Sequence, residues 1–146
     1  MRTVQPIRDV EKIAAMKAQL LKTGRRNWFL FVLGINTGLR ISDILKLKVK
    51  DVKGKSRLMI YEQKTGKYKQ FKINRELQQH RAANKIGISE IGTHTLRKTF
   101  GYHFYQRTKD VALLQEILNH SSPSITLRYI GINQDIIDNA VDDFSL

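Results

Sequence analysis

An apolar segment in the first third of the chain constrains the fold more than any other feature. Residues 25–36 contain the run WFLFVLGI, which is apolar on every side of a helix rather than along one stripe. Such a helix is stable only where other elements surround it, so we expect it at the centre of the core. The chain has 146 residues and no cysteine, which predicts one domain held by hydrophobic burial without disulfides.

Cap residues on either side of this segment predict further helices. Asp9 is a typical N-cap for an amphipathic helix that ends near Gly24. Thr37-Gly38 predicts the end of the buried helix, because glycine readily adopts the left-handed conformation found there. Ser42 is expected to cap a short helix that extends to about Leu47.

The middle of the chain has a strand-like pattern with glycine turn signals. We expect three antiparallel strands, near 48–52, 58–61 and 67–73. The tip of the hairpin formed by the last two strands carries Lys64 and Lys67. The sheet is therefore small and has basic side chains at its turn.

The second half of the chain returns to helical patterns. A helix is expected to begin near Asn74, Thr93 to cap a longer one, and Asp110 and Ser122 to cap two more. The last residues, 130–146, form an acidic tail with apolar side chains at helical spacing. The predicted fold class is α+β, mainly α-helical with a small three-stranded antiparallel sheet.

The charge of the chain indicates a polyanionic partner. Lys and Arg number 26 against 13 Asp and Glu, which gives a net charge of +13 at pH 7. Four of the acids lie in the tail, where there is no Lys or Arg, so the body is more basic still. Nucleic acid is the commonest partner of such a body, whereas a merely solvated lysine-rich face is the plain alternative. Charge alone does not distinguish double-stranded DNA from RNA.

The composition disfavours several other classes of protein. The longest apolar run is too short for a bilayer and the first residues lack a signal-peptide core, so we expect a cytoplasmic, nucleoid-associated protein. The acids of the basic body are scattered, which disfavours a two-metal nuclease, and there is no P-loop for ATP. We expect no metal ion, no cofactor, no membrane and no small-molecule substrate.

Metal-free attack on a phosphodiester needs a cationic clamp, a nucleophile and an acid. Arginine suits the clamp because its planar fork binds phosphate oxygens in pairs. Arg40 follows the predicted end of the buried helix, and Arg97 lies three residues after His94 at the start of another helix. Taken singly, each residue is equally well explained as a surface or packing group.

Two segments resemble the signature boxes of the tyrosine recombinases, the phage integrase family. They are TGLRISDILKL (37–47) and HTLRKTF with LLQEILNHSSPSITLRYI (94–130). The family pattern is an arginine in a T-G-x-R turn, a lysine at a β-hairpin, His-x-x-Arg, a histidine or tryptophan after Leu-Gly, and a nucleophilic tyrosine. This sequence supplies the set in that order: Arg40, Lys64, His94, Arg97, His120 and Tyr129.

The resemblance implies cleavage of DNA by a tyrosine. Tyr129 would attack the scissile phosphate and leave a 3′-phosphotyrosyl link with a free 5′-hydroxyl. Arg40, Arg97 and His120 would hold the phosphate. A phenol with a pKa of roughly 10 is both a nucleophile and a leaving group, so a second DNA hydroxyl can reverse the step without ATP.

The resemblance also implies supporting roles for three residues. Lys64 would protonate the leaving 5′-oxygen, and His94 would assist proton transfer. Asp43 occupies a position that is usually acidic in the family and would orient Arg40. The left-handed helix end before His120 is expected to fall on Asn119, where the family usually has glycine.

Two departures from the family pattern concern domain organisation. The chain between the hairpin and His94 is shorter than in the family, which indicates an internal shortening near His80-Arg81. Met1 begins just before the catalytic domain, so we interpret 1–146 as an integrase-type catalytic domain without the N-terminal core-binding domain. The tail 130–146 would dock either on its own domain or on a neighbouring protomer in a tetramer on DNA.

The leading hypothesis from the sequence is therefore a site-specific DNA recombinase domain. Two alternatives remain open at this point. One is a basic helical module that binds DNA without cutting it, and the other is a type IB topoisomerase-like domain, which shares the chemistry.

Overall fold

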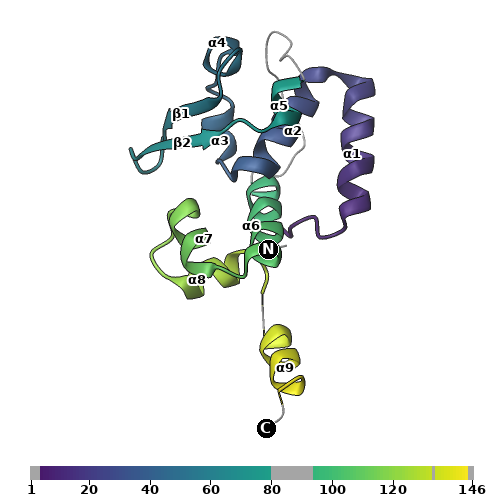
Figure 1. Ribbon diagram of the computed structural model, residues 1–146, viewed down its shortest axis with the longest axis vertical. Helices are drawn as coiled ribbons and strands as arrows, with labels where there is room; N and C mark the ends of the chain where they lie inside the picture. The colour runs from purple at the N-terminus through teal and green to yellow at the C-terminus, as the bar shows by residue number, and fades with distance from the viewer. Residues whose placement is uncertain (1–3, 80–93, 133, 145–146) are drawn as a thin grey trace.

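The computed structural model describes residues 4–79, 94–132 and 134–144. Figure 1 shows a mainly helical fold with a short hairpin at one edge. In chain order the elements are α1 (Val10–Thr23), α2 (Arg25–Thr37), α3 (Ile41–Ile44), α4 (Val49–Val52), β1 (Arg57–Tyr61), β2 (Tyr68–Lys72), α5 (Arg75–Gln79), α6 (Thr95–Thr108), α7 (Val111–Leu118), α8 (Pro123–Tyr129) and α9 (Gln134–Asp142).

Helix α2 lies at the centre of the larger core, as its sequence predicts. Every side chain from Trp28 to Leu33 is buried, and α1, α3, α5 and α6 all contact this helix. Helix α6 approaches it closely at Gly34, where an added Cβ would lie 2.6 Å from Leu96 Cδ1. This contact packs the end of α2 against the start of α6. Arg40 lies just after the end of α2, and Arg97 lies in the first turn of α6.

A second, smaller core lies on the other side of α6. Leu114, Leu118 and Ile130 are fully buried there, and aromatic side chains of α6 pack against them. Gly101 lets this cluster reach the helix, because an added Cβ would lie 2.6 Å from Ile130 Cγ2. Helices α7 and α8 are thereby held against α6, which separates the two cores.

The sheet in the described residues has two antiparallel strands, β1 and β2. Tyr61 faces Tyr68 across the ladder, and Arg57 faces Lys72. The prediction of a third strand near 48–52 is wrong, because those residues form helix α4 and its N-cap. Asp51 Oδ2 accepts a hydrogen bond of 2.8 Å from the Lys48 backbone N–H, which stabilises the start of a helix and not a strand.

Most predicted caps are confirmed. Asp9, Asp110 and Ser122 each accept a backbone N–H at the start of α1, α7 and α8, and α2 ends at a left-handed Gly38 with φ 66°. One boundary differs, since α3 begins with Arg40 as its N-cap instead of Ser42 and ends at Ile44. The prediction for Thr93 lies outside the described residues, as does the shortening near residues 80–81.

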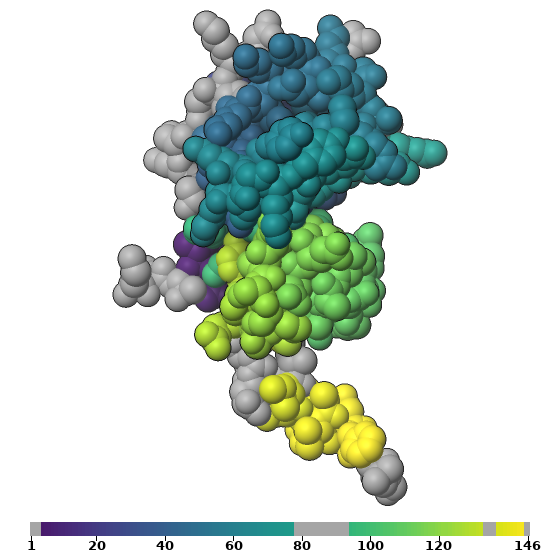
Figure 2. Space-filling view, turned by 90° about the vertical axis from the view of Figure 1, so that its left-hand side faces the viewer, coloured from purple at the N-terminus to yellow at the C-terminus, as the bar shows by residue number. Residues whose placement is uncertain are grey.

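Helix α9 extends beyond the two cores in Figures 1 and 2. Its residues Ile137 and Val141, and Phe144 beyond its end, are 56%, 64% and 68% exposed, so this apolar side is not buried in the chain's own core. A search of the described helices finds none with the length and apolar character needed to cross a membrane.

Candidate active site

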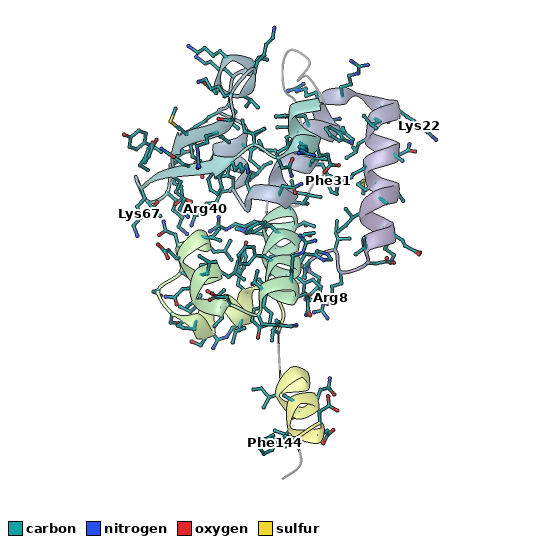
Figure 3. All side chains as sticks on the ribbon, viewed as in Figure 1. Arg8, Lys22, Phe31, Arg40, Lys67 and Phe144 are labelled. Carbon is teal, nitrogen blue, oxygen red and sulfur yellow. The ribbon has the colours of Figure 1, made fainter. Side chains whose placement is uncertain are left out.

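Arg40 is positioned by a tight turn between α2 and α3. Gly38 is left-handed, and an added Cβ there would lie 2.5 Å from Phe100 Cδ1 of α6. Glycine is therefore required at this position by conformation and by space. The Arg40 side chain is 18% exposed, and Figure 3 shows it between the hairpin and α7.

Arg97 is buried between the ends of two helices. Its side chain donates to the Gly38 carbonyl at 2.6 Å, at the end of α2, and to the Leu118 carbonyl, at the end of α7. Burial and then the charge of Arg40 lower the pKa of Arg97, although an arginine at neutral pH stays charged. The two guanidinium groups therefore lie close enough to repel each other.

Tyr129, the last residue of α8, is half-buried between two histidines. Its Oη lies 3.5 Å from His94 Nδ1, and its ring packs edge-on against His120 with centroids 5.0 Å apart. Lys98 Nζ lies 5.1 Å from the ring centroid. The phenol thus faces a group that can accept its proton.

The pKa of the Tyr129 phenol depends on both arginines. Burial raises the pKa of Tyr129, whereas the charges of Arg97 and Arg40 and a hydrogen bond from Arg97 lower it, with a net rise. The structure therefore brings both guanidinium groups and the phenol together, as the sequence predicts. With a raised pKa the phenol is neutral at pH 7.

The two histidines beside Tyr129 are neutral at pH 7. Burial, followed by the charges of Arg97, Arg40 and Lys69, lowers the pKa of His120 to about 4. Burial and nearby cations also lower the pKa of His94. His120 Nδ1 lies 3.0 Å from Thr126 Oγ1, which fixes the ring.

Lys64 lies in the exposed turn between β1 and β2. Its positive charge is among those that lower the pKa of His94, which places it on the side of the site. Lys67, the other lysine at the tip, donates to Asn119 Oδ1 at 2.9 Å. Asn119 is left-handed, with φ 61°, as expected for this helix end. The hairpin therefore reaches the end of α7.

Glu62 and Lys69 belong to the site but were not singled out by the sequence analysis. Glu62 is 2% exposed, and its Oε2 lies 3.3 Å from Arg40 Nη1. Lys69 Nζ lies 3.5 Å from Glu62 Oε1 and also donates to the Ile117 carbonyl. The one feature of the sequence that could have pointed to Glu62 is the position of this acid just before the turn that carries Lys64.

Asp43 is buried but contacts a different group from the one expected. Its Oδ1 accepts the Gln63 backbone N–H at 2.8 Å, which holds the hairpin turn. Among the described side chains, the carboxylate paired with Arg40 belongs to Glu62. The negative charge of Asp43 raises the pKa of Arg97, so this carboxylate faces the other arginine.

The charge of the site suits an anion. Two arginines and Lys69 outnumber the two buried carboxylates here, Glu62 and Asp43, and Arg40 Nη1 is ion-paired with Glu62 Oε2 at 3.3 Å without a well-aligned hydrogen bond. No cluster of three metal-ligating side chains occurs within the described ranges. A phosphate oxygen would give this Arg40 N–H the aligned hydrogen bond that it lacks.

Comparison with known sequences identifies a family and a closely similar relative. Residues 72–135 match the model of the phage integrase family. The "Probable integrase/recombinase YoeC" of Bacillus subtilis (strain 168) is 49% identical over 169 residues, which cover 92% of this chain and 93% of that protein. Because the aligned length exceeds the 146 residues of this chain, the relative holds residues within the alignment that this chain lacks.

Solved structures agree on the fold. The catalytic domain of bacteriophage HP1 integrase has 25% identity and a TM-score of 0.54, with 80% of each chain covered. The XerH site-specific recombinase bound to palindromic difH substrate, in a post-cleavage complex, has 18% identity and a TM-score of 0.62. That match covers 97% of this chain and 54% of XerH, so the chain spans about half of that recombinase. The predicted fold class is confirmed, with a two-stranded sheet.

Proposed function

Since the chain belongs to the phage integrase family, the tyrosine recombinases, we propose that it cuts and rejoins double-stranded DNA at specific sites through a covalent link to Tyr129. The observation that carries this proposal is the convergence on one phenol of two guanidinium groups, both of which lower its pKa against burial. That arrangement stabilises a phenolate as it forms and binds the phosphate that it attacks.

In the cleavage step the Tyr129 oxygen attacks the scissile phosphorus. The P–O5′ bond breaks, and the products are a 3′-phosphotyrosyl ester and a 5′-hydroxyl. The phenol proton passes to His94, whose Nδ1 is 3.5 Å from the phenol oxygen. The lowered pKa of His94 keeps it neutral and able to accept that proton. One phosphoester replaces another, so rejoining needs no ATP.

The arginines are proposed to hold the non-bridging phosphate oxygens. Arg97 is fixed by two main-chain carbonyls, and Arg40, which is ion-paired with Glu62, has a guanidinium N–H whose hydrogen bonding a phosphate oxygen would complete. We assign to neutral His120 the tautomer in which Nδ1 accepts the Thr126 hydroxyl and Nε2 carries the proton, so that Nε2–H donates to the phosphate. We assign to Lys64 the protonation of the leaving 5′-oxygen, since it lies in an exposed turn and its charge acts on His94.

Self-association is proposed through the C-terminal helix. The exposed apolar residues Ile137, Val141 and Phe144 lie away from both cores, where a second copy could cover them. We propose that α9 docks on a neighbouring copy and that four copies assemble on DNA. A protein with this activity would work in the cytoplasm, beside the nucleoid.

A covalent-capture experiment tests the function without knowledge of the target site. The protein is incubated with a library of nicked duplexes of random sequence, so that the short 5′-hydroxyl strand is lost after cleavage. Protein-linked DNA is recovered under denaturing conditions and sequenced. We expect an enriched sequence with wild type and no linked DNA with Tyr129→Phe.

The two alternative functions predict different results in the same covalent-capture experiment. A DNA-binding module would retain the library by affinity without any covalent product, which would contradict the proposal. A topoisomerase-like domain would link to DNA with little sequence preference and relax supercoiled plasmid, which would contradict the assignment of site-specific recombination.

A further inference from the structure

We propose that Glu62 is a positioning residue that holds Arg40 and the lysine turn in one arrangement with the end of α7. The inference rests on the proposed function, because it concerns the geometry of the same site. Among the described side chains, the contacts of the Glu62 carboxylate are with Arg40, Lys69, Thr65 and Asn119, and not with the Tyr129 phenol.

Four side chains from three parts of the chain meet at the Glu62 carboxylate. Oε2 lies 3.3 Å from Arg40 Nη1, accepts from Thr65 Oγ1 at 2.7 Å and accepts from Asn119 Nδ2 at 2.9 Å. Oε1 lies 3.5 Å from Lys69 Nζ. One buried group therefore connects the T-G-x-R turn, the hairpin and the helix end before the second histidine.

Two of these partners are chain neighbours of proposed catalytic groups. Thr65 follows Lys64, and Asn119 precedes His120. A shift of the carboxylate would therefore displace the lysine turn and the helix end together. Asp43 holds the same turn at a second point, because its Oδ1 accepts the Gln63 backbone N–H. This second bond limits the positions that the turn can adopt.

A buried carboxylate in this site needs an explanation, because the substrate is an anion. Its negative charge opposes phosphate binding, so it does not serve affinity. Arg40, Lys69 and Arg97 lie close together as like charges; burial first, and then the charges of these neighbouring cations, lower the pKa of Lys69 and of Arg97. Glu62 offsets that repulsion and keeps the cations in place before DNA arrives.

The main chain at Glu62 makes the isosteric variant informative. The backbone of Glu62 bonds to Gly66 N at 2.8 Å and Lys67 O at 2.9 Å, so the turn is also closed without the side chain. Glu62→Gln keeps the size of the side chain and one carbonyl acceptor while removing the charge. We therefore expect the variant to fold.

The first test measures single-turnover formation of the covalent adduct on the duplex selected in the capture experiment. For Glu62→Gln we expect the maximal rate to fall by about 100-fold, as misplacement of reacting groups does, with no rise in the half-saturating protein concentration. Glu76→Gln is the matched control, since Glu76 on α5 is ion-paired with Lys17 of α1 and not with a residue of the site. It should react like wild type.

Double-mutant cycles separate positioning from general damage. If Glu62 acts through its partners, its loss should cost less in a Lys64→Ala or Arg40→Ala background than in wild type. Thr65→Val, a change in the exposed turn, should lower the rate by a smaller factor with normal folding. A wild-type rate for Glu62→Gln, or additive losses in both cycles, would overturn the inference.

A second measurement needs no DNA and so separates this inference from the proposed function. Hydrogen exchange at the turn amides of residues 62–67 should be faster by about tenfold in Glu62→Gln, because charge-assisted bonds are lost. Amides of α1 should not change. Unchanged turn exchange would overturn the inference even if wild type forms no adduct, whereas absence of the adduct alone would overturn only the proposed function.

Discussion

The two sides of the site hold their arginines by different means. On the hairpin side, Arg40 is ion-paired with the Glu62 side chain. On the α6 side, Arg97 donates to main-chain carbonyls at the ends of α2 and α7. Figure 2 shows these two sides as adjoining parts of one surface, with the teal hairpin above the green helices.

This difference makes the α6 side, with Arg97, the rigid half of the site, and the hairpin side, with Arg40, the adjustable half. Carbonyls at helix ends move only when the helices move, and these helices are fixed by buried Leu96 and Leu118. A carboxylate on a strand end moves with its hairpin, which has only two strands in the described residues. We therefore expect changes on the α6 side to lower the free energy of unfolding as well as the cleavage rate, and changes on the hairpin side to lower mainly the cleavage rate.

The largest effect is expected for the arginine of the rigid half. Arg97→Ala should abolish most cleavage, by about 1000-fold, and should also destabilise the fold by about 3 kcal/mol, because two buried carbonyls lose their donor. Arg40→Ala should lower cleavage comparably but cost only about 1 kcal/mol. Urea unfolding and adduct formation measure both. Equal losses of stability would break the comparison.

The turn that carries Arg40 gives the next largest effect. Gly38→Ala should destabilise the protein by about 3 kcal/mol, since it combines a left-handed conformation with a clash against Phe100. Gly54→Ala is the matched control, because Gly54 is left-handed with φ 74° but has open space around it. It should cost about 1 kcal/mol. Thermal unfolding of both variants that showed the same loss would contradict the packing argument.

The pH dependence of stability tests the electrostatics of the rigid half. His120 has a pKa of about 4 in the folded protein, against an ordinary 6.5, so the unfolded chain binds more protons between these values. The free energy of unfolding should therefore fall as the pH is lowered from 6.5 to 4. His120→Gln should flatten that part of the curve. Parallel curves for the variant and wild type would show that His120 is not held neutral.

The smallest effect on stability is expected for the C-terminal helix. Replacing Ile137 and Val141 by serine should change the free energy of unfolding by less than about 0.5 kcal/mol, because both side chains are exposed. Sedimentation on the selected DNA should show reduced assembly of the same variant. A large loss of stability would instead show that α9 packs on its own domain.

Local rules were sufficient for most of the fold. The wholly apolar helix α2 is central, and the left-handed ends at Gly38 and Asn119 and the cap at Ser122 occur where the residue types predict them. The strand expected at 48–52 failed because a strand-like composition was outweighed by one side-chain cap. Asp51 was close enough in the chain to provide it.

The partner of Arg40 could not be obtained in the same way. Asp43 is three residues from Arg40, and the resemblance to the tyrosine recombinases implied it as the partner, whereas Glu62 is far along the chain. Asp43 instead binds the backbone of the hairpin turn. Which acid reaches the guanidinium depends on where the hairpin packs, and no local pattern reports that.

The amino-acid sequence by itself determined the helices, their ends and the order of the six residues proposed to act on DNA, because these depend on side-chain type and on neighbours a few positions away. Only the tertiary structure decided that both arginines face Tyr129 and that Glu62 lies behind Arg40. Those relations join residues far apart in the chain. They exist because two hydrophobic cores pack against α6, and this packing brings the ends of α2, α7 and α8 together beside the start of α6.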